Sequence, residues 1–167
     1  MEAPPLRASA PISAALELNM IESAEEFKRL RESDIPEEYN RAAYEEAETE
    51  VWKDVLEKHP EMSFWVAQNK TVPIEILKVL ATNQDPDVRD MVARKRKIPE
   101  SLMLTLAVDG DESVRLALAN NAKVTEKVLN ILISDSWQVV RERASVKLKA
   151  LTRHSNGSSA AARLRSV

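Results

Sequence analysis

The chain contains no cysteine among its 167 residues. Disulfides, iron–sulfur clusters and thiol catalysis are therefore excluded, and the absence agrees with a reducing, cytoplasmic compartment. Glycine occurs twice, and aromatic residues make up 4% of the chain. A β-sandwich needs more glycine turns and more alternating aromatic and β-branched residues, so this composition argues against β-structure.

Long apolar runs are missing as well. None approaches the roughly 18 residues of a membrane-spanning helix, so we predict a soluble protein with no membrane partner. The first nineteen residues lack the basic start and the long apolar stretch of a signal peptide. Because residues 1–19 are rich in proline and alanine, we expect them to be disordered.

What the chain does contain favours helices. Ala, Leu, Glu, Lys and Arg recur throughout, and these residues lose little conformational freedom on entering a helix. The formal net charge is −3, but it is unevenly placed. Residues 1–60 hold 7 basic and 15 acidic side chains, whereas residues 61–167 hold 17 basic and 12 acidic ones. Such asymmetry is typical of a dipolar surface or of a protein with a polyanionic partner.

A repeat of 26 residues is the strongest pattern in the sequence. The columns that recur at this interval are the Val-Arg pairs beginning at Val88, Val114 and Val140, the leucines Leu80, Leu106 and Leu132, and the alanines Ala67, Ala93 and Ala119. So many columns at one interval indicate a stack of similar units, each too small to bury its own apolar face.

Each unit is predicted to hold two short helices. Pro73 suits the start of a helix, because its missing N–H would be unpaired in the first turn. Ile76, Leu77 and Leu80 then form one apolar face. The helix is expected to stop before Pro86, since a residue that precedes proline avoids helical angles. A second short helix follows over Val88 to Ala93.

These patterns divide the chain into four parts. After the disordered residues 1–19, an acidic helical cap spans residues 20–58 and begins with the capping box Ser23 to Glu26. Three or more 26-residue helical repeats occupy residues 59–151 and end in a closing helix over about 138–151. Residues 152–167, rich in Ser, Ala and Arg, are expected to form a flexible tail.

The repeat resembles the leucine-rich repeat variant, a relative of HEAT-like α-solenoids. The resemblance is carried by Val66-Ala67-Gln68-Asn69 with Pro73, by Val88-Arg89 through Ala93 with Pro99, and by Val114-Arg115 through Ala119 with Asn121. It implies an all-α fold, a short right-handed solenoid of alternating α and short or 3₁₀ helices. Three residues depart from the pattern: Lys95 stands in place of the Asn, Thr125 in place of the Pro, and Ser145 in place of the Ala. Some family members hold a cysteine-ligated iron–sulfur cluster, which this chain cannot bind.

No catalytic or metal-binding set is recognisable in the sequence. His59 and His154 have no neighbouring ligands at metal-binding spacing. Gly110 and Gly157 stand alone, so there is no glycine-rich phosphate loop. We therefore predict a protein that is not an enzyme and that uses no cofactor and no metal.

The arginine column has two interpretations. Arg89, Arg115 and Arg141 are expected to stack along one surface, one unit apart. They would either grip carboxylates or phosphates of a partner, or pair with aspartates such as Asp109 to link neighbouring units.

The basic turn, Arg94-Lys95-Arg96-Lys97, is the best candidate for partner binding. Four cations occupy one turn between helices, where the neighbouring units have mostly uncharged residues. Basic clusters bind nucleic acids or acidic proteins, although a solvated loop has the same composition. Trp65 and Trp137 lie near the ends of the array, where they would fill gaps in the core or serve as binding hot spots.

The function expected from these features is that of a non-enzymatic protein-binding module. A bacterial immunity or inhibitor protein that blocks a toxin is one concrete form. A nucleic-acid-binding protein that uses the basic half of the chain is an alternative, and a scaffold or accessory subunit of an enzyme complex is another.

Overall fold

The computed structural model describes the backbone of residues 20–163 and the side chains of residues 20–153. The described part is all-helical, as the composition predicts. It contains no β-strand, and its single isolated bridge joins Ile21 to Ala47. The predicted disorder of residues 1–19 falls outside the described residues.

Three helices form the acidic N-terminal part: α1 (Ala24–Glu32), α2 (Pro36–Tyr44) and α3 (Thr49–Lys58). Helix α1 begins as the capping box predicts, because the Ser23 hydroxyl accepts a hydrogen bond from the Glu26 N–H at 3.1 Å. The Glu26 carboxylate accepts from the N–H of Glu22. Phe27 and Trp52 are fully buried and pack edge to face, with ring centroids 5.2 Å apart.

An arginine joins this N-terminal part to the rest of the molecule. The guanidinium carbon of Arg31, on α1, lies 3.7 Å from the ring centroid of Tyr39 on α2 and 3.3 Å from that of Trp65 on α4. Burial lowers the pKa of Arg31, because the guanidinium has exchanged water for two aromatic faces. Trp65 is half-buried against the core, whereas Trp137 is 37% exposed and fills no core gap.

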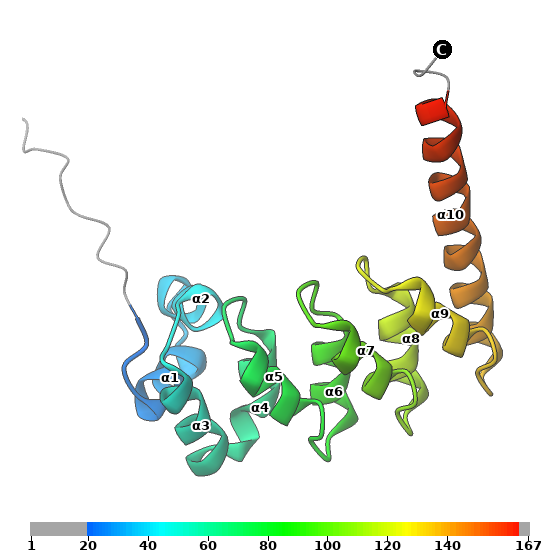
Figure 1. Ribbon diagram of the computed structural model, residues 1–167. Coiled ribbons are helices and arrows are strands. Elements are labelled where there is room, and N and C mark those ends of the chain that lie inside the picture. The colour runs from blue at the N-terminus through cyan, green and yellow to red at the C-terminus, as the bar shows by residue number, and fades with distance from the viewer. Residues whose placement is uncertain (1–19, 164–167) are drawn as a thin grey trace, which may run out of the picture.

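Short helices follow one another along the length of the molecule (Figure 1). They are the 3₁₀ helix η1 (Pro60–Met62), α4 (Ser63–Gln68), α5 (Ile74–Leu80), α6 (Pro86–Ala93), α7 (Glu100–Leu106), α8 (Glu112–Asn120) and α9 (Glu126–Leu132). Helices α4, α6, α8 and α10 each pack on the next member of that series, and α7 packs on α9. The shorter helix of each pair is α-helical over seven residues, and η1 is the one 3₁₀ helix among the described residues.

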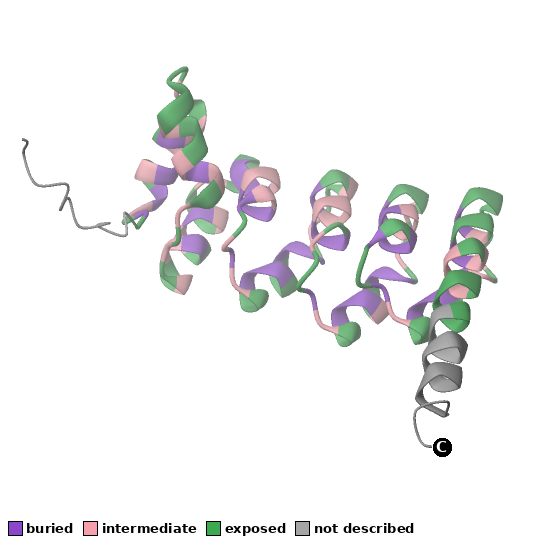
Figure 2. Ribbon diagram, turned by 90° about the horizontal axis from the view of Figure 1, so that it is seen from above, coloured by how far each residue is buried: buried purple, intermediate pink, exposed green. Residues whose placement is uncertain are grey.

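The buried columns match the 26-residue interval. Leu80, Leu106 and Leu132 are each at most 1% exposed and belong to one continuous apolar core. Ala67, Ala93 and Ala119 are fully buried, and their small side chains let α4, α6 and α8 approach closely. Buried residues therefore line the inner sides of the helices along the array (Figure 2).

The last helix, α10 (Gln138–Arg163), continues past residue 151, where we expected the closing helix to end. No proline interrupts residues 138–163, and a single glycine inside a helix lowers its stability without having to end it. The predicted flexible tail, 152–167, therefore begins within a helix, and its last four residues lie outside the described range.

Candidate binding groove and the ladders that frame it

The basic turn follows α6 and precedes α7. Arg94 is 61% exposed, and its Nη2 donates to Asp90 Oδ1, one helical turn earlier, at 3.1 Å. The hydrogen bond to Asp90 raises the pKa of Arg94. Arg96 and Lys97 are exposed, and neither forms an ion pair with any residue of the described part. Two of the four cations are thus free to meet a partner.

Lys95 has a different role from its neighbours. Its ammonium donates to the backbone carbonyls of Gln68, at 3.2 Å, and of Asn69, both of which lie in the preceding turn. Burial, helped by repulsion from Lys70, lowers the pKa of Lys95 to about 8. The structure therefore corrects the expectation of a four-cation surface, because the Lys95 ammonium fastens two turns together.

The same role recurs along the array. The residues at this position are Asn69, Lys95, Asn121 and Lys147, which we call the Asn/Lys column. The side-chain amide of Asn69 donates to the carbonyls of Ala42 and Glu45 at 2.9 and 3.0 Å. That of Asn121 donates to the carbonyls of Ala93 and Lys95 at 2.7 and 2.8 Å. Lys95 and Lys147 donate to carbonyls of the preceding unit with an ammonium instead of an amide. Lys95 therefore keeps the structural role of the Asn that it replaces.

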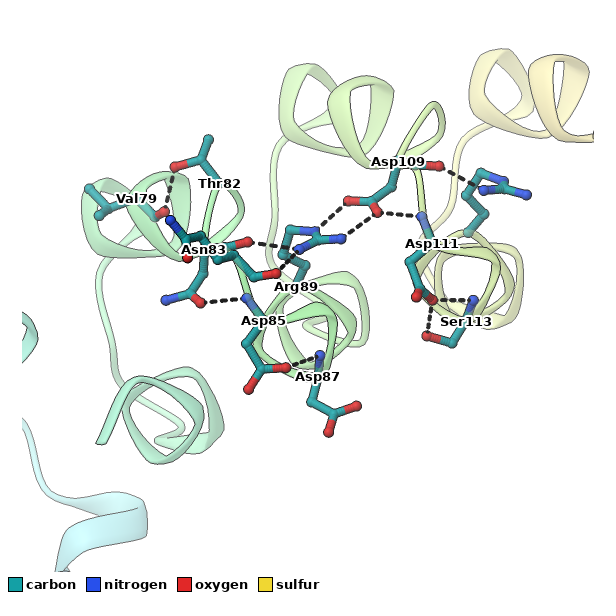
Figure 3. A network of polar contacts seen from close by, with 11 residues as sticks. Val79, Thr82, Asn83, Asp85, Asp87, Arg89, Asp109, Asp111 and Ser113 are labelled. Atoms are coloured by element: carbon teal, nitrogen blue, oxygen red, sulfur yellow. Dashed lines mark hydrogen bonds and ion pairs between the residues drawn. The ribbon is translucent and has the colours of Figure 1, made fainter. Parts of the chain in front are cut away.

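The arginine column forms a second ladder, on the opposite set of turns. Nε and Nη2 of Arg89 donate to both carboxylate oxygens of Asp109, at 2.8 and 2.9 Å. Arg115 binds Asp135 in the same way, at 2.6 and 3.1 Å. Each arginine thus grips an aspartate of the following unit, and Figure 3 shows this contact for Arg89 together with the turns that position it.

The third donor of each arginine holds its own turn. Nη1 of Arg89 donates to the carbonyls of Asn83 and Gln84 at 2.8 and 3.0 Å. Nη1 of Arg115 donates to the carbonyl of Asp109 at 2.7 Å. The paired side chains are at most 16% exposed. Every guanidinium nitrogen of Arg89 and Arg115 therefore donates to an acceptor within the chain, as expected if these arginines link neighbouring units.

Ionisation of the aspartates follows from this pairing. Burial of Asp109 opposes its charge, but the hydrogen bonds from Arg89 and from the Asp111 N–H outweigh burial, and the pKa of Asp109 lies below its ordinary value. The same balance holds the pKa of Asp135 low, with Arg115 as the main partner. The hydrogen bond to Asp109 raises the pKa of Arg89 in return. Both pairs are therefore charged over the whole neutral range.

A groove of about 710 Å³ lies beside the basic turn. Its lining residues are Glu46, Lys70, Thr71, Val72, Ile74, Leu77, Arg94, Lys95, Arg96 and Lys97. Five of these are cationic and one is acidic, while Val72, Ile74 and Leu77 supply an apolar surface. Ile74 is 41% exposed, so part of that apolar surface is open to solvent.

The sequence indicated the basic turn but not the groove. Lys70 comes from the preceding turn, and Glu46 from the loop between α2 and α3. Lys70 is exposed and forms no ion pair within the described residues, which adds a third free cation to Arg96 and Lys97. Only packing of one turn beside the next brings these residues together.

The described residues show no other chemical centre. No group of three His, Cys, Asp or Glu side chains is placed to hold a metal ion in that part of the chain. His59 lies within 4.0 Å of Glu25 and Glu61, and the side chain of His154 is outside the described set. Within the same residues, no helix has both the length and the apolar character needed to cross a bilayer.

Comparison with known proteins adds no relative: the chain matches no family model, no curated protein and no solved structure. The resemblance to the leucine-rich repeat variant therefore stays a prediction, and function is argued from the groove alone.

Proposed function

We propose that the chain is a short right-handed α-solenoid that binds another protein through the groove beside the basic turn. The proposal is supported by the serial packing of α4, α6, α8 and α10, which is how helical repeats stack. It follows the expectation of a non-enzymatic binding module. A bacterial immunity or inhibitor protein is one form that such a module takes.

The observation that carries the proposal is the set of unpaired cations around an apolar floor. Lys70, Arg96 and Lys97 surround a groove whose floor includes Val72 and Leu77. An acidic protein segment with an apolar side chain matches both features, because the carboxylates meet the cations while the apolar group covers the floor. Four other cations of the repeats, Lys78, Lys123, Arg143 and Lys149, also form no ion pair among the described residues, but none of them lines the groove.

A nucleic acid is the competing partner, since phosphates also seek exposed cations. No aromatic side chain lines the groove, which removes the stacking surfaces that single-stranded nucleic acids use. Duplex binding through three or so phosphate contacts would weaken steeply with salt. Fluorescence anisotropy with labelled duplex DNA and RNA at two salt concentrations separates this alternative, and strong salt-sensitive binding there would replace the proposal.

The experiment is affinity capture with the full chain and two variants. The test variant carries Arg96→Ser and Lys97→Ser, and it leaves Lys95 in place because Lys95 supports the turn. The control is Lys123→Ser, since Lys123 is the exposed residue of the next unit that corresponds to Lys97, and it does not line the groove. Far-ultraviolet circular dichroism verifies that both variants fold.

We expect a partner that the wild type and the control retain and that the test variant loses. Removing two charged contacts lowers affinity by about tenfold or more, because each 1.4 kcal/mol is a factor of about ten. A folded test variant that retains every partner of the wild type would show that the groove is not the binding site.

A further inference from the structure

Arg141 is held in place like the other two arginines of its column. It lies at the start of α10, and its Nη1 donates to the carbonyls of Asp135 and Ser136 at 2.7 and 2.8 Å. Arg89 makes the same pair of bonds to the carbonyls of Asn83 and Gln84. The Arg141 guanidinium is therefore oriented by its own turn, just as the Arg89 guanidinium is.

Arg141 differs from Arg89 and Arg115 at the other edge of its guanidinium, which carries Nε and Nη2. In Arg89 and Arg115, Nε and Nη2 bind the aspartate that follows twenty residues later. The corresponding position after Arg141 is Ala161, which lies inside α10 and has no carboxylate. Among the described side chains, no carboxylate lies within 4.0 Å of Arg141. The Arg141 guanidinium is thus oriented, and no described carboxylate binds its Nε and Nη2.

The surface next to this fork is partly apolar. Trp137, one helical turn before Arg141, is 37% exposed. An exposed aromatic group beside an arginine is typical of the centre of protein interfaces. A partner that docks at this end of the array would meet apolar surface and a guanidinium together.

We propose that Arg141 binds a carboxylate side chain of the partner protein, in the two-pronged geometry that Asp109 and Asp135 show with the preceding arginines. This inference rests on the proposed protein-binding function and adds a second contact at the end of the array. A carboxylate is favoured over a phosphate because the chain itself shows twice that this fork accepts an aspartate between neighbouring units.

The test uses the arginine Nε–H signals in ¹⁵N-resolved NMR spectra of the full chain. Sodium acetate is titrated at constant ionic strength, with sodium chloride making up the difference. We expect a saturable shift of the Arg141 Nε–H signal. The Nε–H signals of Arg89 and Arg115 should stay in place, since both groups already donate to aspartates. These two residues are matched internal controls.

Two results would overturn the inference. An Arg141 signal that moves no more than those of Arg89 and Arg115 would mean that the fork is not available. A larger response to inorganic phosphate than to acetate would assign the site to phosphate groups, and so to a nucleic-acid partner.

A variant links this site to the partner. Arg141→Lys keeps the charge but loses the fork. With the fold verified by circular dichroism, we expect the amount of captured partner to fall by severalfold. If the groove variant loses its partner while acetate leaves Arg141 unmoved, the inference fails and the proposed function stands. If the acetate response is present while the groove variant retains its partner, the groove proposal fails instead.

Discussion

Replacing Lys95 by asparagine is expected to stabilise the protein at neutral pH and to remove part of its pH dependence. Asn69 and Asn121 occupy the equivalent positions and make the same kind of bonds to carbonyls without carrying a charge. An asparagine at 95 would keep these bonds and avoid burying an ammonium. The substitution therefore isolates the cost of the buried charge.

The size of that cost follows from the pKa of Lys95. Burial lowers it from the ordinary 10.5 to about 8. The difference corresponds to about 3 kcal/mol, by which the protonated lysine disfavours the folded state. Above pH 8 the folded protein releases this proton while the unfolded chain still holds it, so the stability of the wild type rises with pH up to about 10.5. Between about pH 7 and about pH 9.5 the gain is about 2 kcal/mol.

The assay is urea denaturation followed by far-ultraviolet circular dichroism at those two pH values. At the lower pH the Lys95→Asn variant should be more stable than the wild type by about 3 kcal/mol, and this advantage should shrink to about 1 kcal/mol at the higher pH. Taking the difference between the two proteins cancels the other titrating groups, Lys147 among them. Lys97→Asn, two residues away and exposed, is the control and should show no such change.

An advantage of Lys95→Asn that is equal at both pH values would refute this reasoning. It would mean that the Lys95 ammonium is solvated. The basic turn would then present all four of its cations to a partner, as the sequence first suggested.

Three further predictions concern the ladder and the core. Arg115→Ala leaves the buried carboxylate of Asp135 without its partner and should lower the free energy of unfolding by about 2–4 kcal/mol, measured by urea denaturation. Leu106→Ala should cost about 2–5 kcal/mol, because Leu106 is fully buried, whereas Val108→Ala at a 70% exposed position should cost almost nothing in the same assay. Because the folded pKa of Asp109 is lowered, its stabilising effect is complete above the ordinary value of 3.8 and is lost as pH falls through the folded pKa. An Asp109→Asn variant should therefore be less stable at neutral pH and should lose less stability on acidification; an acid titration parallel to that of the wild type would contradict this.

The sequence predicted the helices well, because their determinants are local. Pro73, Pro86 and Pro99 lie within one residue of the starts of α5, α6 and α7, and the leucines of the 26-residue column face the core as expected. Proline geometry and apolar spacing need no knowledge of distant contacts. The handedness and curvature of the stack depend on many small rotations between units, and they stay predictions.

The candidate site was harder to predict, because it depends on how one turn lies against the next. The sequence showed four adjacent cations, but the interior position of Lys95 depends on the carbonyls of Gln68 and Asn69, a whole unit earlier. The alternation Asn69, Lys95, Asn121, Lys147 at the repeat interval was visible in the sequence and would have identified this role. Lys70 and Glu46, by contrast, have no local feature that assigns them to the groove.

The Arg–Asp contacts run in one direction, since each arginine reaches forward to the next unit. The unit of Asp109 and Arg115 is consequently clamped on both sides, whereas the unit of Asp135 and Arg141, which continues into α10, is held on one side only. Opening at that end breaks a single junction, whereas opening in the middle breaks two. Amide hydrogen exchange should accordingly be faster in the first turns of α10 than in α8, which lies in the unit held on both sides.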